Sequence, residues 1–466
     1  MTDRRFSVAE HDRLLPAQPI ATLDDWLEGD GGLGYATALD LDRDDVIGMV
    51  ERSGLRGRGG AGFPTGRKWR GVLEVAEDSE SPVFLVANAA EGEPGTYKDR
   101  TIIEYNPYAF LEGMLIAMYA VGAQRAFIGI KEKFTGPVER LAQAMEEMIA
   151  AEWRGADQIE LVPGPDEYLF GEEKAMLEVI EGKLPMPRII PPYQAGLFAT
   201  TQHPNPTVVN NVETFSHIPG IVAHGPDWFR EVGTEDSPGT MVFTVVGDVD
   251  NEGVYELPLG TPLETLLVDI AGARDIKAIY SGTSNTVITP DQLEVPLTFD
   301  AMSEAGTGLG SGGFIVYDSS HCIVKVLAKL SRFLAIESCG QCNACVLGTE
   351  EITDLLEKVD AGDGTQTDLD AIAKRVTTVT DQNRCYLPVG EQLMVGSTLD
   401  RFADEFTAHL GEPCPSDREV PTPLIEHIDE DSGEVTYHPR YHKKQPDWSY
   451  EDEDPREQRM RAITQE

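Results

Sequence analysis

SGLRGRGGAGFPTGRKW, residues 53–69, is the most informative stretch of this sequence. It contains six glycines, with three arginines and one lysine placed among them. Glycine lets the main chain come close to a ligand, and consecutive main-chain N–H groups flanked by cationic side chains suit a phosphate group. The stretch therefore predicts a site for the phosphate of a nucleotide. The alternative is a mobile glycine-rich surface loop.

Residues 57–62 also fit the dinucleotide pattern G-x-G-x-x-G, which requires a strand before it and a helix after it. The preceding residues, 41–52, carry apolar side chains at helical spacing, and Gly54 is placed as the stop of that helix. An ordinary Rossmann strand-to-helix turn is therefore disfavoured. A Walker A loop is excluded as well, because Arg67 rather than lysine follows Gly66.

The charge of the chain is strongly acidic. Its 80 Asp and Glu residues against 38 Lys and Arg give a formal net charge of −42. Because the excess is spread through every segment, binding to nucleic acid or to an anionic membrane surface is disfavoured. The preferred explanation is a halophilic protein in a salt-rich cytoplasm, where ions screen the self-repulsion of the carboxylates.

No segment is predicted to enter a membrane. The most apolar stretch, residues 109–123, contains Glu112 and is too short to span a bilayer. Six cysteines in 466 residues do not indicate a disulfide scaffold. Cys322 is expected to lie in the core, and Cys414 has no assigned role. We therefore predict a cytoplasmic protein, with peripheral attachment to the cytoplasmic face of the membrane through partner subunits as the alternative.

Length and pattern predict an α/β protein of several domains. A loose N-terminal arm (1–40) precedes a Rossmann-like α/β domain (41–235), in which helical and strand patterns alternate. A small β-grasp (ubiquitin-like) domain (236–320), a four-helix bundle (321–411) and an acidic extended tail (412–466) follow. The expected strands are 83–87, 125–130, 241–247, 253–257, 276–280 and 314–317. The expected helices are 41–52, 110–121, 137–152, one capped by Thr261 with Pro262 at its first position, 322–337, 344–359, 369–379 and 391–410.

Four cysteines of the bundle form a metal-binding pattern. Cys339, Cys342 and Cys345 have the spacing C-x2-C-x2-C, and Cys385 follows from a later segment. Three closely spaced thiolates with a distant fourth are the ligand set of a [4Fe–4S] cluster. Zinc is the alternative, although zinc sites usually place their ligands as two separated pairs.

Taken together, these segments resemble a known family, the NADH-binding flavoprotein subunit of respiratory complex I. Diaphorase subunits of NAD-linked hydrogenases and formate dehydrogenases belong to the same family. The resemblance covers roughly residues 40–412. It rests on the glycine stretch and on NAAEGEPGTYKDR (88–100), YLFGEEKA (168–175), PTVVNNVET (206–214), GTGLGSGG (306–313) and ESCGQCNAC (337–345).

The resemblance implies that the α/β domain binds FMN and that NADH lies against the flavin. It implies catalytic roles for Glu93, beside the nicotinamide, and for Glu172. Glu173 would lie near the adenosine ribose and repel a 2′-phosphate, which favours NADH over NADPH. The cofactor-binding residues that it implies are Gly57, Gly59, Gly60, Phe63, Lys68, Asn88, Glu91, Glu93, Tyr168, Gly171, Glu172, Glu173, Tyr193, Asn210, Asn211 and Thr214.

Three positions depart from the family. Ala90 stands where a carboxylate near the flavin is usual, Ile190 replaces a lysine, and Gly71 stands where a second aromatic side chain is common. The last two changes remove a charge and a stacking surface that hold NADH, so a weaker affinity for NADH is expected.

By resemblance, NADH gives a hydride to FMN, and single electrons then leave through the cluster. The acceptor implied is a thioredoxin-like [2Fe–2S] partner subunit, followed by further iron–sulfur subunits and a quinone or another acceptor. The alternatives are a diaphorase module of a hydrogenase or formate dehydrogenase, an electron-transfer or assembly subunit that has lost NADH oxidation, and a zinc-holding scaffold.

Overall fold

The glycine-rich stretch joins two helices in the computed structural model, which describes residues 13–429 and 432–438. Helix α3 (Arg43–Ser53) ends at Gly54, whose φ of 73° lies in the left-handed region that glycine enters without a steric penalty. Helix α4 (Thr65–Ser79) begins directly after the loop. The predicted helix before the loop is confirmed, and within residues 13–56 no strand precedes the glycines.

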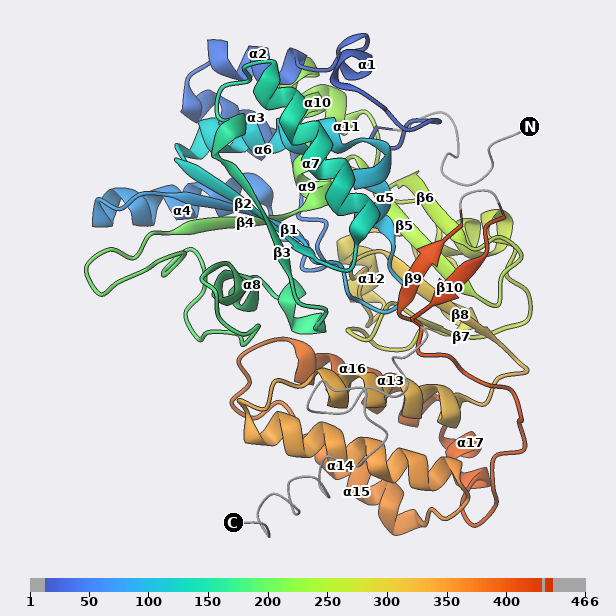
Figure 1. Ribbon diagram of the computed structural model, residues 1–466. Coiled ribbons are helices and arrows are strands. Elements are labelled where there is room, and N and C mark those ends of the chain that lie inside the picture. The colour runs from blue at the N-terminus through green and yellow to red at the C-terminus, as the bar shows by residue number, and fades with distance from the viewer. Residues whose placement is uncertain (1–12, 430–431, 439–466) are drawn as a thin grey trace.

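A parallel sheet forms the centre of the α/β part of the chain (Figure 1). Its strands β1 (Phe84–Ala89), β2 (Arg125–Lys131), β3 (Ile159–Gly164) and β4 (Thr207–Asn211) lie in the order β3-β2-β1-β4. From β1 the chain builds outward to β2 and β3 on one side, and β4 joins on the other side. The carboxyl ends of β1 and β4 are therefore the point where the strand order reverses, which is where open α/β sheets bind ligands. Asn88 of β1 is paired in register with Asn211 of β4 at this point.

Helices cover this sheet, and its two inner strands are apolar along most of their length. In the described ranges, no helix combines the length and the apolar composition needed to cross a bilayer. The remaining elements of this part are α1 (Leu23–Leu27), α2 (Leu33–Asp40), α5 (Lys98–Tyr105), α6 (Pro107–Val121), α7 (Thr135–Ala150), α8 (Glu173–Ile180), α9 (Val212–Ser216), α10 (Ile218–His224), α11 (Pro226–Arg230) and the short turns η1 (Ala156–Gln158) and η2 (Tyr168–Gly171).

The prediction of a loose N-terminal arm is wrong for residues 13–40. Leu14 and Leu15 are buried, and their main-chain N–H groups donate to the carboxylate of Glu256 at 2.9 Å. Glu112, inside α6, accepts from the main-chain N–H of Tyr35 at 2.9 Å. Carboxylates that are remote in the sequence thus satisfy main-chain donors of the arm, and sequence periodicity does not reveal such pairs.

A second, mixed sheet lies beside the first and contains β5 (Thr240–Gly247), β6 (Gly253–Pro258), β7 (Ile276–Tyr280) and β8 (Gly313–Asp318). Its order is β6-β5-β8-β7, with the inner pair parallel and the outer pairs antiparallel. The helix predicted to be capped by Thr261 with Pro262 at its first position begins at Leu263 and continues as the π-helical turn η3 (Thr265–Ile270). Its start also bonds to a later segment, because the N–H of Leu263 donates to the main-chain oxygen of Val295 at 3.0 Å. The short elements η4 (Pro290–Gln292) and α12 (Phe299–Glu304) follow.

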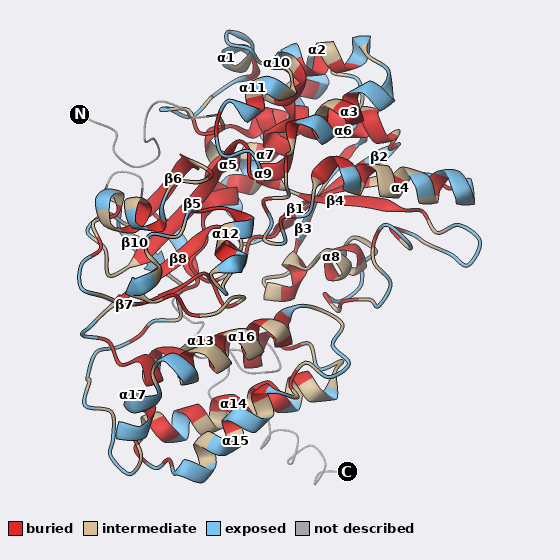
Figure 2. Ribbon diagram, turned by 180° about the vertical axis from the view of Figure 1, so that it is seen from behind, coloured by how far each residue is buried: buried red, intermediate tan, exposed pale blue. Residues whose placement is uncertain are grey.

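Below both sheets lies a helical bundle of α13 (Ile323–Glu337), α14 (Asn343–Asp360), α15 (Gln366–Val376), α16 (Leu387–Arg401) and α17 (Ala403–Ala408). The outer faces of α14 and α15 are exposed and their inner faces are buried (Figure 2). The single helix predicted for residues 391–410 is wrong: it begins earlier and is broken at Phe402, whose φ of −118° and ψ of 28° are not helical.

The prediction of an extended tail is wrong for residues 425–438, where β9 (Ile425–Ile428) and β10 (Val435–Tyr437) form an antiparallel hairpin. Arg100 donates to the main-chain oxygen of Ile425 at 2.9 Å, and the N–H of Gly95 donates to that of Pro423 at 2.7 Å. These bonds fasten the hairpin to the segment that leads into α5. The acidic end of the predicted tail lies outside the described residues.

Two helical glycines provide a matched test of packing. A Cβ at Gly113 in α6 would lie 1.9 Å from the main-chain oxygen of Phe215, whereas a Cβ at Gly71 in α4 would have no atom within 4 Å. We expect Gly71→Ala to raise the free energy of unfolding by about 0.5–1 kcal/mol, because alanine restricts the unfolded chain. Gly113→Ala should lower it by about 1–3 kcal/mol through overpacking. Thermal unfolding midpoints check both changes, and a stable Gly113→Ala protein would contradict the packing.

Candidate functional site

The four predicted metal-ligating thiols come together at one end of the bundle. Cys339, Cys342, Cys345 and Cys385 line a single hollow, together with apolar side chains that include Leu169. They come from two places: three lie where α14 begins, Cys342 being its N-cap, and the fourth lies just before α16.

Burial raises the pKa of Cys345 and of Cys385 to about 12. These thiols would stay protonated alone, so a bound metal must stabilise their thiolate form. Four converging soft donors with a mostly apolar lining fit an iron–sulfur cluster.

The glycine loop lies at the point where the strand order reverses. A Cβ at Gly59 would lie 3.2 Å from Cβ of Asn211, and Gly60 has a φ of 121°. Gly57 closes the loop by donating its N–H to the main-chain oxygen of Phe63 at 2.9 Å. Within the same stretch the buried hydroxyl of Thr65 has no hydrogen-bond partner among the described residues. A close-approach glycine and an orphaned hydroxyl fit a phosphate-bearing cofactor.

Arg58 fixes the loop in place. Its main-chain N–H donates to Oγ1 of Thr214 at 2.9 Å, and its buried guanidinium donates to the main-chain oxygen of Thr240 at 3.0 Å. The first bond ties the loop to α9 and the second ties it to the start of β5. The second sheet therefore positions the loop, a role for Arg58 that sequence reasoning missed.

Three further predicted residues meet beside the end of β4. Nζ of Lys68 donates to the main-chain oxygen of Val209 at 2.9 Å and lies 3.4 Å from a carboxylate oxygen of Glu173. Asn210 accepts from Nε1 of Trp69 at 3.2 Å. Lys68 and Glu173 are partly exposed, so solvent screens their pairing.

Asn88 lies at the other side of this point. Its Nδ2 donates to the main-chain oxygen of Gly171 at 2.6 Å. Gly171 is needed there, because a Cβ would lie 2.9 Å from the main-chain oxygen of Ala90. Ala90 itself is buried in an apolar cluster with Val86 and Phe170. The position that departs from the family is thus filled by apolar packing.

Glu93 is half-buried and held from two directions. Its carboxylate accepts from the hydroxyl of Tyr168 and, at 2.6 Å, from the main-chain N–H of Thr283, in the turn that follows β7. Burial raises the pKa of Glu93, although both hydrogen bonds oppose the shift. Thr283 was missed, because a contact across 190 residues leaves no local pattern.

Glu172 caps α8 and accepts from the main-chain N–H groups of Lys174 and Ala175 at 2.9 and 3.0 Å. Burial raises the pKa of Glu172 to about 7, against the opposing charge of Lys174. Its carboxyl can therefore hold a proton near neutral pH.

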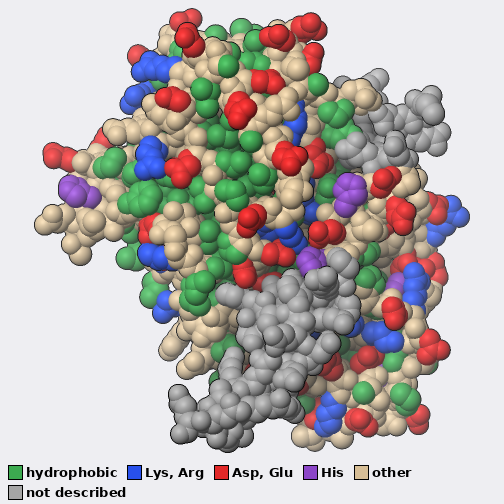
Figure 3. Space-filling view, in the orientation of Figure 1, with side chains coloured by type: hydrophobic (Ala, Val, Ile, Leu, Met, Phe, Trp, Pro, Cys, Tyr) green, Lys and Arg blue, Asp and Glu red, His purple; other side chains and the backbone are tan. Residues whose placement is uncertain are grey.

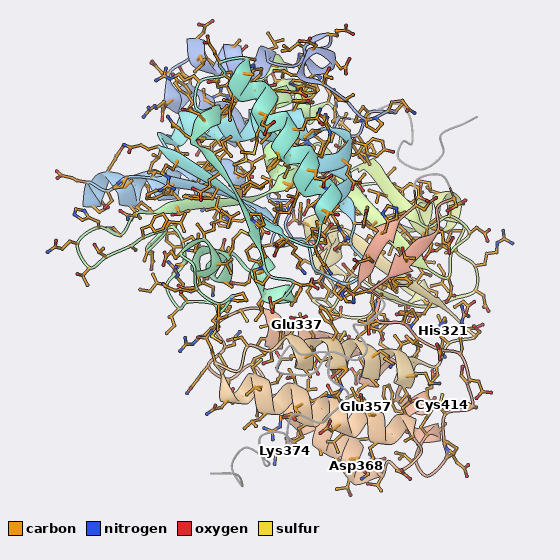
Figure 4. All side chains as sticks on the ribbon, in the orientation of Figure 1. His321, Glu337, Glu357, Asp368, Lys374 and Cys414 are labelled. Atoms are coloured by element: carbon orange, nitrogen blue, oxygen red, sulfur yellow. The ribbon has the colours of Figure 1, made fainter. Side chains whose placement is uncertain are left out.

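The segment 168–175 reaches from this pocket to the thiols. The N–H of Tyr168 donates to Oε2 of Glu337 at 2.9 Å, at the end of α13 that faces the α/β part (Figure 4). The next residue, Leu169, lines the hollow of the four thiols. One short segment therefore contacts both the carboxylate pocket and the candidate cluster site.

The side chains of three other predicted cofactor-binding residues make none of the contacts described above. Phe63 and Tyr193 are about half exposed, at 49% and 45%. Glu91 is buried, and both of its carboxylate oxygens are taken: Arg100 donates to one at 2.9 Å, and the main-chain N–H of Asp99 donates to the other at 3.2 Å.

A buried ionic network beneath the loop was also missed. Nζ of Lys98 lies 2.7 Å from Asp99, 2.9 Å from Glu213 and 3.1 Å from Oδ1 of Asn211. Burial alone would lower the pKa of Lys98, but the two carboxylates outweigh it and raise that pKa. Lys98 and Glu213 stand inside the segments 88–100 and 206–214 that carry the family resemblance, and their place in those segments was the signal available.

Two family models match this chain. The Nuo51 FMN-binding domain matches residues 50–220, and the NADH-ubiquinone oxidoreductase-F iron–sulfur binding region matches residues 325–409. Among curated proteins, the second F-type subunit of NADH-quinone oxidoreductase from Rhizobium meliloti is 38% identical over 80% of this chain and 90% of the relative. The NADP-reducing hydrogenase subunit HndC of Solidesulfovibrio fructosivorans is 35% identical over 85% of this chain and 82% of its own length. A solved structure of NAD⁺-reducing [NiFe]-hydrogenase in the H₂-reduced state aligns with a TM-score of 0.75 and 34% identity, over 86% of this chain and 68% of that chain.

Proposed function

Because this chain belongs to the F-type subunit family of NADH-quinone oxidoreductases, whose members are NADH dehydrogenase flavoproteins with FMN and a [4Fe–4S] cluster, we propose how its own residues serve that reaction. The observation that carries the proposal is the segment 168–175, which contacts both the Glu93 pocket and the thiol hollow. A flavin in that pocket and a cluster in that hollow would thus be joined by one short segment of the chain.

The glycine loop would hold the phosphate and ribityl chain of FMN through Gly57, Gly59, Gly60 and Lys68, with Asn210, Asn211 and Thr214 beside them. Asn88, Glu91, Tyr168, Gly171 and Glu172 would line the isoalloxazine side. When bound, FMN supplies the conversion of a two-electron hydride donor into single electrons. The chain supplies orientation: Asn88 and Tyr168 are fixed by hydrogen bonds, and the half-buried Glu93 would lie beside the nicotinamide. Cys339, Cys342, Cys345 and Cys385 would ligate the cluster.

A thioredoxin-like [2Fe–2S] subunit is the proposed first acceptor, followed by further iron–sulfur subunits and a quinone. A second candidate is the diaphorase module of a hydrogenase, which the likeness to HndC and to the NAD⁺-reducing [NiFe]-hydrogenase favours. Co-purification decides between them, because a hydrogenase large subunit would accompany the chain only in the second case.

We also propose the domain division 41–235, 236–320 and 321–411, with the second unit a β-grasp. The order β6-β5-β8-β7, with a parallel inner pair and antiparallel outer pairs, supports that assignment. The proposed location is the cytoplasm, with any attachment to a membrane made through partner subunits.

Glu173 gives a test of coenzyme choice. In anaerobic titrations, NADH is expected to bleach the flavin and produce the cluster's electron paramagnetic resonance signal at lower concentration than NADPH. Glu173→Gln should improve the apparent affinity for NADPH by about fivefold, because one exposed like-charge repulsion amounts to about 1 kcal/mol. Glu77→Gln, an exposed residue farther along α4, is the charge-matched control. If NADPH bleached the flavin of the unaltered protein in preference to NADH, the proposal that Glu173 repels a 2′-phosphate would be wrong.

The surface gives a test of halophily. Acidic side chains outnumber basic ones in the whole chain, and they are scattered over the face in Figure 3 rather than gathered in one patch. Dialysis from about 1 M to about 0.1 M salt lengthens the screening distance from about 3 Å to about 10 Å. The unfolding temperature is therefore expected to fall steeply in low salt, and an unchanged midpoint would contradict a halophilic origin.

A further inference from the structure

A second group of metal-ligating side chains lies at the opposite end of α13 from the thiol hollow. The two cysteines to which sequence reasoning gave no metal role, Cys322 and Cys414, meet His409 and Asp360 there. Each residue offers one ligand atom, and all four atoms lie within 4.8 Å of one another. We propose that these four side chains bind one Zn²⁺ ion as a closed structural site.

The ligands come from four separate places in the bundle. Cys322 is the N-cap of α13, Asp360 is the last residue of α14, and His409 is the C-cap of α17. Cys414 lies in the linker that leaves the bundle, at the end beside α17 (Figure 4). Since α13 has 15 residues, the site is about 22 Å from the cluster end of that helix. It is therefore distinct from the site of electron transfer.

His409 is oriented as a metal ligand is. Its Nδ1 lies 2.8 Å from the main-chain oxygen of Glu405, which can only accept, so Nδ1 carries the proton and Nε2 presents its lone pair to the cysteines. Nε2 lies 3.3 Å from Sγ of Cys322. In metalloproteins the ring nitrogen away from the metal is held in this way by a carbonyl or carboxylate.

Asp360 supplies the second, independent observation. Its Oδ1 is buried and has no hydrogen-bond partner among the described residues. An unsatisfied buried carboxylate oxygen is costly, and a cation is the group that would satisfy it. The main-chain oxygen of Asp360 also accepts from the N–H of Cys414 at 3.2 Å, which brings the linker thiol to the carboxylate.

The donor set selects the metal. Two thiolates, one imidazole and one carboxylate are ligands that Zn²⁺ takes in a tetrahedron, with Zn–S near 2.3 Å and Zn–N near 2.0 Å. Those bond lengths place two sulfur atoms about 3.8 Å apart, so the four ligands would close by up to about 1 Å on binding. An iron–sulfur cluster of the usual kind would require four thiolates. Because four protein ligands leave no open position, the role is structural rather than catalytic.

Such an ion would fasten the linker that runs from the bundle to the β9–β10 hairpin. The linker already lies closely on the bundle: a Cβ at Gly362 would lie 2.4 Å from the main-chain nitrogen of Pro413, and Nζ of Lys325 donates to the main-chain oxygen of Ser416 at 2.6 Å. Zinc would thus join the ends of α13, α14 and α17 to the start of the linker. That linker leads to the β9–β10 hairpin, which Arg100 contacts.

Metal analysis of the full chain with its cofactors tests the proposal. After growth with added zinc, about one zinc and four irons per chain are expected. Cys414→Ser should lose the zinc and keep the iron, whereas Cys342→Ser should lose the iron and keep the zinc. Less than about 0.2 zinc per chain in the unaltered protein, or full zinc in Cys414→Ser, would overturn the site.

A measurement on the unaltered protein makes the result independent of variant folding. Zinc-edge X-ray absorption should report two sulfur neighbours near 2.3 Å and two lighter neighbours near 2.0–2.1 Å. Four sulfurs would instead indicate zinc in the cluster hollow, and six oxygens would indicate adventitious surface zinc, so either outcome contradicts the proposal.

Trypsin cleavage after the exposed Arg418 should also be faster in Cys414→Ser than in Cys342→Ser, because only the former frees the linker.

Discussion

Replacing Cys385 by serine is expected to remove the cluster and stop electron transfer to the iron–sulfur partner while NADH still bleaches the flavin. Cys385 is one of four thiols around a single hollow, and it comes from a segment separate from the other three. Altering an outer-shell partner of a metal site already costs about 10–100-fold, so the loss of a ligand should lower partner reduction by more than about 100-fold.

The measurements are iron content, the electron paramagnetic resonance signal after reduction by NADH, and the rate of electron delivery to the partner. Reduction of a small oxidant that collects electrons directly from the flavin should be nearly unchanged. Cys322→Ser is the matched control for iron, because the proposed zinc ligand that it removes lies at the far end of α13 and its iron content and reduced-cluster signal should be unchanged. Full iron content in Cys385→Ser would refute the four-thiol ligand set.

The second large effect concerns folding. Lys98→Met is expected to lower the free energy of unfolding by about 3–5 kcal/mol, because it leaves Asp99 and Glu213 as buried carboxylates without their cation. Flavin retention should fall as well, since Lys98 also bonds to Asn211 beside the glycine loop. Denaturant unfolding and flavin content after gel filtration, both in high salt, check the two effects.

Arg125→Met is the control for that prediction. Arg125 lies 2.8 Å from Glu160, but both side chains are more than half exposed. Exposed pairs contribute about 0–1 kcal/mol, so this variant should behave nearly as the unaltered protein does. If both variants lost the same free energy of unfolding, the buried network around Lys98 would contribute no more to stability than an exposed ion pair does.

The sequence predicted those features that depend on residues close together in the chain. The helix ending at Gly54, the strand near residues 84–89 and the spacing of Cys339, Cys342 and Cys345 all depend on neighbours within a few residues. It failed where a long-range contact overrides local pattern. The arm around Leu14, predicted to be loose, is ordered by the carboxylate of Glu256, and the segment 425–438, predicted to be extended, forms a hairpin held by Arg100.

The candidate site divides in the same way. Residue types and their spacing predicted the glycine cradle and the cluster thiols, because each of those chemistries needs particular atoms close together along the chain. No spacing could reveal that Thr283 holds Glu93, that β5 anchors Arg58, or that Cys322 meets Cys414. Those contacts join residues that lie far apart in sequence, and their partners become neighbours only when the whole chain has folded and packed around them.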